Sequence, residues 1–463
     1  MSSIVTRSAT GFHADALAAF LEGRDEPSWF GDRRRAAFER FIQTPLPTLR
    51  DEEWRRTDLR GLKLDQFGPV AGGPASPSEA LSASPAWSTL AETHGAEFGV
   101  HHRDGRPATH PASAPELPAG VVFTDLATAL KRHPDLIQRH LGHAIDTQAD
   151  AFALLQSAFV SGGVALYVPQ GVKLDHPLFH LIELGPDGRS DFNHTLVILE
   201  KGAEATFIQE TASTQRPDKT PALHVGAVEL FVGERAKLRF VNIQNWDRQT
   251  WHFSRERAVV AAEGALQWTV GGLGARLAKV NQDVALAGPR ARAQVNGVLF
   301  TTGRQHLAYF TRQDHQAPQT TSDLLYKGGL TDHSRLVWKG MIRVEPDAQK
   351  TDAYQKNDSL ILSPHARSDS IPGLEIEAND VRCTHGATAG PIDPEMLFYC
   401  RSRGLGREES VRLIVEGFFA NVYDRISLES ARATLETVVA QRFAESVGLP
   451  ADAIAASLAR EKA

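Results

Sequence analysis

The chain is poor in cysteine, with only Cys383 and Cys400 among its 463 residues. Two thiols cannot form a disulfide framework. They also exclude an all-cysteine zinc or iron–sulfur site built from this chain alone, because such sites take about four thiolates. The cysteine count therefore leaves room only for a metal site that other residue types or another chain complete.

Long apolar runs and an excess of basic charge are missing as well. No run approaches the roughly 20 apolar residues that span a bilayer, and the first residues lack the apolar core of a signal peptide. The 50 Lys and Arg against 56 Asp and Glu give a net charge of −6, which argues against a nucleic-acid partner. Hydrophobic residues make up 42%, enough to bury a sizeable core. We expect a soluble cytoplasmic protein with no membrane or nucleic-acid contact.

Familiar catalytic motifs are also missing. The chain has no GxxxxGK[ST] phosphate loop and no CxxC, HExxH or GxSxG sequence, and the GGLG run at 271–274 lacks the third glycine of a dinucleotide-binding loop. His101 and His102 lie beside a Pro-rich stretch, where we expect them to be solvated. We therefore predict no catalytic residues, and we expect that the chain is not an enzyme.

Three regions differ in their residue pattern. Residues 1–160 show helical spacing interrupted by Pro-, Ser- and Ala-rich stretches at 68–85 and 106–120, which we interpret as linkers. Residues 161–392 alternate apolar and polar residues in short runs, which predicts strands. Residues 393–463 return to helical spacing and begin with an Asp-Pro pair typical of a helix start.

The strand runs resemble one another. Each has a strand, a tight turn with an alanine and a second strand, and these alanines are Ala203, Ala236, Ala265, Ala291 and Ala348. Their spacings are 33, 29, 26 and 57 residues, the last close to two periods. A small residue repeated at each turn favours a β-solenoid, whose coils stack to bury their apolar faces. A β-sandwich or barrel is the alternative, because it also has regular strands and turns. We expect the terminal helices to cover the ends of the solenoid.

One long segment carries a family resemblance. The sequences AQKTDAYQ, ARSDSIPGLEIEANDVRCTHGATAG and LFYCRSRG, between residues 348 and 404, closely resemble the SufB/SufD family of iron–sulfur cluster assembly proteins. The stretch PLPTLRDEEWRRTDLRGLKLDQF and the CTHGAT sequence are similar to the SufD branch in particular. The resemblance covers residues 27–67 and 155–440, and leaves the stretches at 69–120 outside it.

The resemblance implies a fold and a role. The fold is a right-handed parallel β-helix (β-solenoid) core flanked by N-terminal and C-terminal helical domains. The role is that of a non-catalytic scaffold subunit that pairs with a SufB-like chain through the β-helix. Its C-terminal helical region docks a SufC-like ATPase, and the apolar positions Val411, Ile414, Val415 and Phe418 are the candidate docking residues.

The resemblance also implies a shared cluster site. His385 matches a family histidine at the SufB–SufD interface, which is proposed to hold the nascent cluster with a SufB cysteine. Cys383 precedes it by two residues, so both side chains would lie on one face of a strand. A structural histidine and a buried thiol are the alternatives. We expect no cluster stably bound to the isolated chain, and a transient iron–sulfur cluster shared with the partner.

The remaining residues of this segment have simpler interpretations. We expect Cys400 to pack in a helical core, and Glu377, Asp380 and Arg382 to be interface or turn residues. We expect the amides in the strands, such as Gln244, Asn245 and Asn296, to face solvent or to form internal ladders.

Two other functions stay open. A SufB-like homodimer would bring four cysteines together, two from each chain, and would carry its own cluster. A homodimer is also possible when the SufB-like partner is absent. A β-helix carbohydrate-active enzyme would need a cluster of carboxylates on its strands, and the sequence shows no paired-carboxylate motif there.

Overall fold

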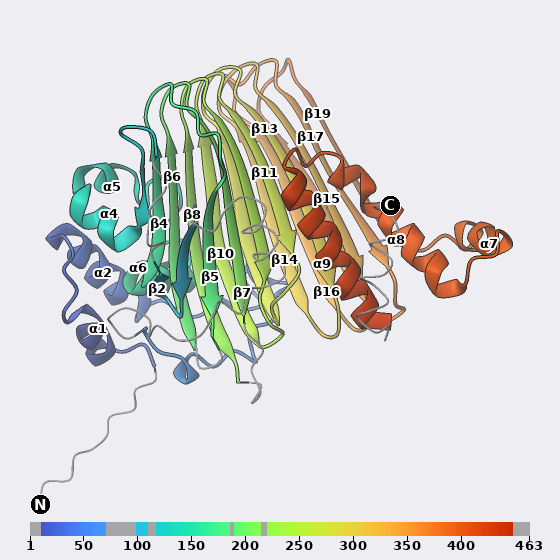
Figure 1. Cartoon of the computed structure of the whole chain (residues 1–463), viewed down its shortest axis with the longest axis horizontal. Helices are drawn as coiled ribbons and strands as arrows, with labels where there is room; N and C mark the ends of the chain where they lie inside the picture. Colours follow the sequence, from blue (N-terminus) through green and yellow to red (C-terminus); the bar gives the residue numbers. More distant parts are fainter. Residues whose placement is uncertain (1–10, 71–98, 110–116, 186–188, 214–219, 448–463) are drawn as a thin grey trace, which may run out of the picture.

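A computed structural model describes residues 11–70, 99–109, 117–185, 189–213 and 220–447. The described chain is mainly β and forms a solenoid of two mainly parallel sheets, with N-terminal helices beside its first coils and C-terminal helices beside its later coils (Figure 1). The fold predicted from the strand pattern and the family resemblance is therefore confirmed.

The solenoid arises because successive strands alternate between two sheets. One sheet, here called sheet A, has the order β19-β17-β15-β13-β11-β9-β7-β5-β1-β2, and sheet B has the order β18-β16-β14-β12-β10-β8-β6-β4-β3. The strands of sheet A are β1 (Gly99–Arg103), β2 (Arg106–Thr109), β5 (Leu178–Leu184), β7 (Glu204–Ser213), β9 (Lys237–Asn245), β11 (Ala265–Gly272), β13 (Arg292–Thr301), β15 (Thr321–Leu330), β17 (Asp352–Ile361) and β19 (Arg382–Pro391). Those of sheet B are β3 (Val122–Asp125), β4 (Gly162–Val168), β6 (Ser190–Leu199), β8 (Ala222–Val232), β10 (Thr250–Val260), β12 (Leu277–Leu286), β14 (His306–His315), β16 (Arg335–Val344) and β18 (Arg367–Ile376).

The register between coils explains the repeat seen in the sequence. Neighbouring coils place residues 27 positions apart in register from Ala265 to Arg292, and 33 positions apart from Glu204 to Lys237. Side chains in register stack on the same side of the sheet, so each interior position forms a row along the solenoid. One apolar row consists of Leu178, Phe207, Phe240, Trp268, Val295 and Leu324.

The turn alanines occupy a crowded corner of each coil. Ala203, Ala236 and Ala291 are fully buried, and each follows a residue in the left-handed backbone region. In the next two coils threonine takes this position, at Thr320 and Thr351, each again after a left-handed residue. Ala348 therefore does not continue the repeat, because it lies three residues earlier in its turn. The spacing of 57 residues from Ala291 to Ala348 is therefore shorter than two full periods of the repeat, which end at Thr351.

The N-terminal helices cover the outer face of sheet B. They are α1 (Ala14–Leu21), α2 (Ser28–Phe41), α4 (Leu126–Arg132), α5 (Pro134–His140) and α6 (Ala151–Phe159), with short 3-10 turns η1 (Glu52–Trp54) and η2 (Leu64–Gln66). Every residue of α6 is buried, and the helix contacts β6 and β8. Aromatic residues of this region, such as Phe38 and Trp54, form one apolar cluster with Phe253 of β10.

The C-terminal helices cover a side of the solenoid instead of its end. They are α7 (Pro394–Ser402), α8 (Arg407–Tyr423) and α9 (Glu429–Val447), and α8 and α9 pack on β13 and β15 of sheet A (Figure 1). Within the described residues, no strand follows β18 or β19, which form the last coil, in either sheet. The expectation that terminal helices cover the ends is therefore wrong for this end, because the apolar faces of α8 and α9 match the outer face of sheet A.

The segment before residue 161 also contributes strands to the solenoid. β1 inserts into sheet A beside β5, and this position buries His101 and His102. The Nδ1 atom of His102 lies 3.0 Å from Nε2 of His180, and Nε2 of His101 lies 3.2 Å from a carboxylate oxygen of Glu183. The expectation of two solvated histidines is wrong, because the local sequence did not reveal the strand pairing.

The strand amides are divided between the two sides of the sheets. Gln244 is buried and bonds the backbone of Gly274, and its neighbours in register are Thr211 and Gly272, so it neither faces solvent nor belongs to an amide ladder. Asn245 is half-buried and accepts a hydrogen bond from Arg442 of α9, and Asn296 is fully buried.

No helix of the described residues is long and apolar enough to cross a membrane.

Candidate functional site

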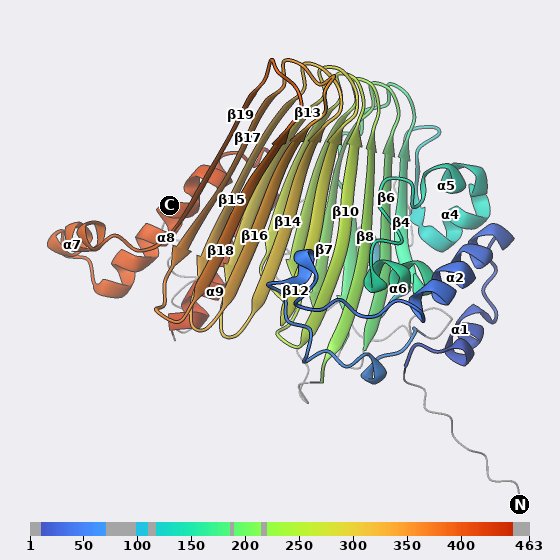
Figure 2. The same ribbon diagram turned by 180° about the vertical axis from the view of Figure 1, so that it is seen from behind.

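The candidate site lies on the last coil of the solenoid. β19 pairs with β17 on one edge and β18 pairs with β16, and each is the final strand of its sheet (Figure 2). Most residues of both strands are exposed or half-buried, in contrast to the preceding coils. A terminal strand presents unpaired backbone N–H and C=O groups, which form a template for another chain.

Cys383 and His385 lie together on this coil. In the parallel register Cys383 stacks on Ala353 and His385 stacks on Gln355, two buried residues whose side chains face the solenoid interior. Cys383 and His385 therefore point along the same interior face, about 7 Å apart along the strand. His385 is exposed and Cys383 is half-buried, because no further coil of the described chain covers them.

The two side chains differ in chemistry. Burial against the preceding coil raises the pKa of the Cys383 thiol, and the nearby Asp352 carboxylate raises it further, while a backbone hydrogen bond from Ala353 opposes this rise. A thiol must lose its proton before it ligates a metal, so a positive charge would have to approach before Cys383 binds. The exposed imidazole of His385 is an ordinary ligand for iron.

The described residues supply no complete metal site. No group of three or more His, Cys, Asp or Glu side chains in the described ranges is placed to hold a metal ion. Cys383 and His385 alone would give two ligands, whereas iron–sulfur clusters are held by about four. The pair can thus form only part of a cluster site.

The surface beside this pair is apolar. Leu374 and Ile376 of β18 are in register with Ile342 and Val344, which are fully buried in the coil below. In the last coil the same two positions are 37% and 41% exposed. Side chains of core type therefore face solvent at this end. The alternation of Leu374 and Ile376 with two glutamates was the sequence signal for this apolar face.

Polar side chains from the coil below lie behind the pair. Gln355 Nε2 donates to the backbone oxygen of Gly373 at 3.0 Å, and Asn357 Nδ2 donates to Ser370 Oγ at 2.5 Å. These bonds cross from sheet A to sheet B and hold the two walls of the last interior layer together. Sequence reasoning missed both amides, because only the register shows that they lie beneath His385 and its strand neighbours.

The three charged residues near the pair lie at the edge of this coil. Glu377 is an ion-pair partner of Arg343 at 3.7 Å. The backbone N–H of Asp380 donates to Gln349 Oε1 at 2.9 Å, which fixes the turn between β18 and β19. Arg382 begins β19 and is exposed.

Cys400 does not lie in a core. It is half-buried on α7, a helix without a single buried residue, whose Met396, Phe398 and Tyr399 are exposed. Helix α7 projects away from the solenoid (Figure 2). The expectation of core packing is wrong, because α7 contacts α8 without burying any of its own residues.

The four candidate docking residues lie on the inner side of α8. Ile414 and Val415 are buried, and Val411 and Phe418 are partly buried against the cluster on sheet A. Phe418 also lies over the ammonium of Lys327, whose Nζ donates to the Phe418 backbone oxygen at 2.7 Å. The exposed apolar residues of this region are instead Leu413 and those of α7.

Comparison with known proteins bears directly on this site. Residues 182–418 match the family model described as "SUF system FeS cluster assembly, SufBD core domain", and residues 104–179 match "SufBD protein N-terminal region". The chain belongs to the SufBD family. The core match includes the whole last coil with Cys383 and His385. The N-terminal match begins at residue 104, inside the stretch at 69–120 that we had placed outside the resemblance.

Related SufBD proteins cover nearly the whole chain. Proteins of Staphylococcus epidermidis, Staphylococcus haemolyticus and Staphylococcus aureus, each named an iron–sulfur cluster assembly SufBD family protein, are 26% identical over 442 residues. In each case the match covers 92% of this chain and 92% of the relative. The chain is thus an iron–sulfur cluster assembly protein of the SufBD family.

Proposed function

We propose that this SufBD protein is a non-catalytic scaffold subunit of the SufD type in a cytoplasmic SUF assembly complex. The observation that carries the proposal is the open last coil of the described chain. There Cys383 and His385 occupy positions that face the solenoid interior in the coil below, but here they are accessible from the open end. Two ligands on an open end suit a site that a second chain completes.

The partner at this end would be a SufB-like chain. Docking would cover Leu374 and Ile376, whose exposed apolar surface favours burial. A strand of the partner could also pair with the free edge of β18 or β19, because main-chain hydrogen bonds support this mode of recognition. Such docking would bring partner thiolates opposite His385.

The cluster would be cargo of the pair of chains. With at most two ligands from this chain, binding to the isolated protein would be weak, and the complete site would exist only in the complex. This arrangement supports a transient iron–sulfur cluster that is shared with the SufB-like chain and then released to an acceptor.

The C-terminal helices would dock a SufC-like ATPase. Leu413 of α8 and the exposed side chains of α7 offer an apolar surface away from the solenoid. Val411, Ile414, Val415 and Phe418 would then serve docking indirectly, because they fix α8 on sheet A. A movement of the ATPase would in this way reach β13 and β15, which α8 contacts.

Coexpression tests the proposal. The full chain is expressed with a SufB-like chain and a SufC-like ATPase, purified through a tag on this chain, and reconstituted with iron and sulfide. We expect a ternary complex that forms a cluster, and an isolated chain with no ATPase activity and little cluster absorbance. Failure to capture either partner would contradict the scaffold role.

A homodimeric scaffold is the second candidate, and the same open coil favours it. Two copies that meet through β18 and β19 would bring two Cys383 and two His385 side chains together. Light scattering of the isolated chain, followed by reconstitution, separates the two candidates. A dimer that holds a full cluster in the absence of any partner would favour the homodimer over the SufD-type subunit.

A further inference from the structure

A groove crosses the outer face of sheet A, at the N-terminal ends of its strands. Its free volume is about 500 Å³, and its floor comes from β7, β9, β11, β13 and β15. Neighbouring strands are roughly 4.8 Å apart, so the floor is about 19 Å long. Such a length suits an extended peptide of about six residues.

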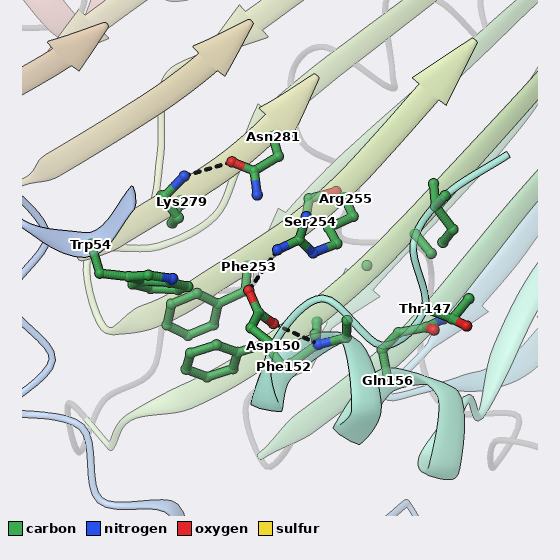
Figure 3. A pocket seen from close by; sticks show the side chains of 15 residues that line it. Trp54, Thr147, Asp150, Phe152, Gln156, Phe253, Ser254, Arg255, Lys279 and Asn281 are labelled. Atoms are coloured by element: carbon green, nitrogen blue, oxygen red, sulfur yellow. Dashed lines mark hydrogen bonds and ion pairs between the residues drawn. The ribbon is translucent and has the colours of Figure 1, made fainter. Parts of the chain in front are cut away.

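The hollow between the N-terminal helices and the outer face of sheet B is, by contrast, almost filled. Phe152, Phe253 and Lys279 line it, and Asp150 pairs with Arg255 beside them at 2.7 Å (Figure 3). Its free volume is about 20 Å³, which holds about one water molecule. Of these two spaces, the groove on sheet A is therefore the one with room for a ligand.

Three cations lie at the middle of the groove. Lys237 and Arg239 come from β9 and Arg292 comes from β13, and all three are exposed. Ala265 of β11 lies in register between Lys237 and Arg292, so a small side chain separates two long ones. The side chains of Arg239 and Arg292 form no ion pair or hydrogen bond with any described residue. Two guanidinium groups are therefore available to a ligand.

The carboxylates that line the groove do not neutralise these arginines. Glu204 of β7 is paired with two lysines, at 2.8 and 3.1 Å. Asp323 of β15 is paired with Arg425 at 3.0 Å. Asp175 is exposed in the segment before β5, on the far side of β7 from the arginines. The lining residues of β9, β11 and β13 include cations and no carboxylate, so the centre of the groove is positive.

Two amides lie beside the arginines. Gln267 Nε2 donates to Gln294 Oε1 at 2.8 Å and to the backbone oxygen of Arg425 at 2.9 Å. Gln267 Oε1 accepts a hydrogen bond from Ser427, so the loop between α8 and α9 holds Gln267 and, through it, Gln294. Gln294 Nε2 forms no hydrogen bond with any described residue and can donate to a carbonyl oxygen of a ligand.

We propose that this groove binds an extended acidic segment of a partner protein. The Cα atoms of Arg239 and Arg292 are two strands and two residues apart, which corresponds to about 12 Å. In an extended peptide, residues four positions apart lie on one side and about 13 Å apart. Two acidic side chains at this spacing match the two guanidinium groups, each through charge-assisted hydrogen bonds. The proposal is independent of the scaffold role and of the last coil.

Fluorescence anisotropy with the full chain tests the proposal. The probe is a labelled glycine–serine peptide of about seven residues, with two glutamates four positions apart. We expect saturable binding that weakens as salt is added, because salt screens exposed charges. The control peptide has the same composition with the two glutamates adjacent. It should bind at least about fivefold more weakly, because it cannot reach both arginines. The net charge of −6 disfavours binding elsewhere on the chain.

Substitutions at exposed positions make the result specific. Arg239→Gln and Arg292→Gln should each weaken binding at least about fivefold, because each removes one charge-assisted contact. Arg290→Gln is the matched control, because Arg290 is exposed two residues before Arg292 but is paired with Glu263. It should change the affinity less than about twofold.

Three outcomes would overturn the proposal. One is the absence of saturable binding up to about 1 mM peptide. The second is an equal loss of affinity in Arg290→Gln and in the two groove variants. The third is tighter binding of citrate than of the peptide, because the groove would then be a site for a small anion.

Discussion

Cys383 and His385 extend two neighbouring interior rows of the solenoid by one coil, over Ala353 and Gln355. In the coil below the two positions are buried, and in the last coil they are open. The same backbone register that builds the core therefore also aligns a thiol and an imidazole on an unoccupied surface.

This relationship predicts loss of cluster assembly without loss of the fold. In the complex with a SufB-like chain and a SufC-like ATPase, His385→Ala and Cys383→Ser should each lower cluster yield severalfold. Because both residues lie on an uncovered coil, the free energy of unfolding should change by less than about 1 kcal/mol. Absorbance after reconstitution and urea unfolding give the two measurements. Thr384→Ala, between them on the opposite face of β19, is the matched control and should keep normal yield.

Two exposed apolar surfaces predict two separable docking defects. Leu374→Asp on the last coil should weaken capture of the SufB-like chain and leave ATPase binding unchanged. Phe398→Asp on α7, where the side chain is 74% exposed, should show the reverse. Each partner is pulled down with both variants, so that each variant serves as the control for the other. If either variant abolished both interactions, the assignment of two surfaces would be wrong.

A buried carboxylate joins the N-terminal region to the solenoid. Glu229 of β8 accepts hydrogen bonds from the backbone N–H groups of Ala144 at 2.7 Å and Ile145 at 3.2 Å, and from Gly142, and it lies 2.8 Å from His194 Nε2. Burial alone would raise the pKa of Glu229, but these bonds outweigh burial and lower it. The stabilisation is therefore present above the unfolded-state pKa and is lost as the pH falls through the lower folded-state value.

Glu229→Gln should lower the free energy of unfolding at pH 7 by about 2 to 4 kcal/mol, because a neutral amide replaces a charged acceptor of several bonds. Below about pH 4 the difference from the unmodified chain should shrink. Urea unfolding at both pH values checks this. Glu234→Gln, which removes a surface partner of Lys201, is the control and should change stability by less than about 1 kcal/mol.

Glu256 predicts the opposite pH dependence. It lies inside the solenoid on β10, where Asn242 and Ser254 donate to its Oε1 at 3.0 and 2.9 Å, and burial raises its pKa to about 7. The folded state thus holds a proton that the unfolded state releases near pH 4.5. Stability from this group is present at low pH and is lost as the pH rises toward 7.

Glu256→Gln should therefore raise the free energy of unfolding at pH 8 by roughly 2 to 3 kcal/mol and change it little at pH 4. Unfolding in urea at the two pH values is the measurement. Glu39→Gln, at an exposed position of α2, should show no such difference. A destabilised Glu256→Gln protein at pH 8 would mean that the charged form contributes to the fold.

Much of the fold could be predicted from residue types that recur at regular spacings along the chain. A small residue recurs at the turns, as at Ala203, Ala236 and Ala291, because stacked coils present the same corner about every 30 residues. Of the apolar positions predicted on α8, Ile414 and Val415 likewise lie on its buried side. Where the expectations were wrong, at His102 and Cys400, the deciding contact or its absence involved strands or faces distant in sequence.

By itself the sequence favoured a solenoid over a sandwich or barrel, because a small residue recurs at turns about every 30 residues. It also placed Cys383 and His385 on one face of a strand, because side chains alternate with a period of 2. Only the tertiary structure decided that the last coil stays uncovered and that α8 and α9 pack on sheet A. It alone placed the Lys279 ammonium beside the rings of Trp54 and Phe310. Such environments are formed by segments that are distant in sequence. Local residue patterns do not specify which of these segments pack together.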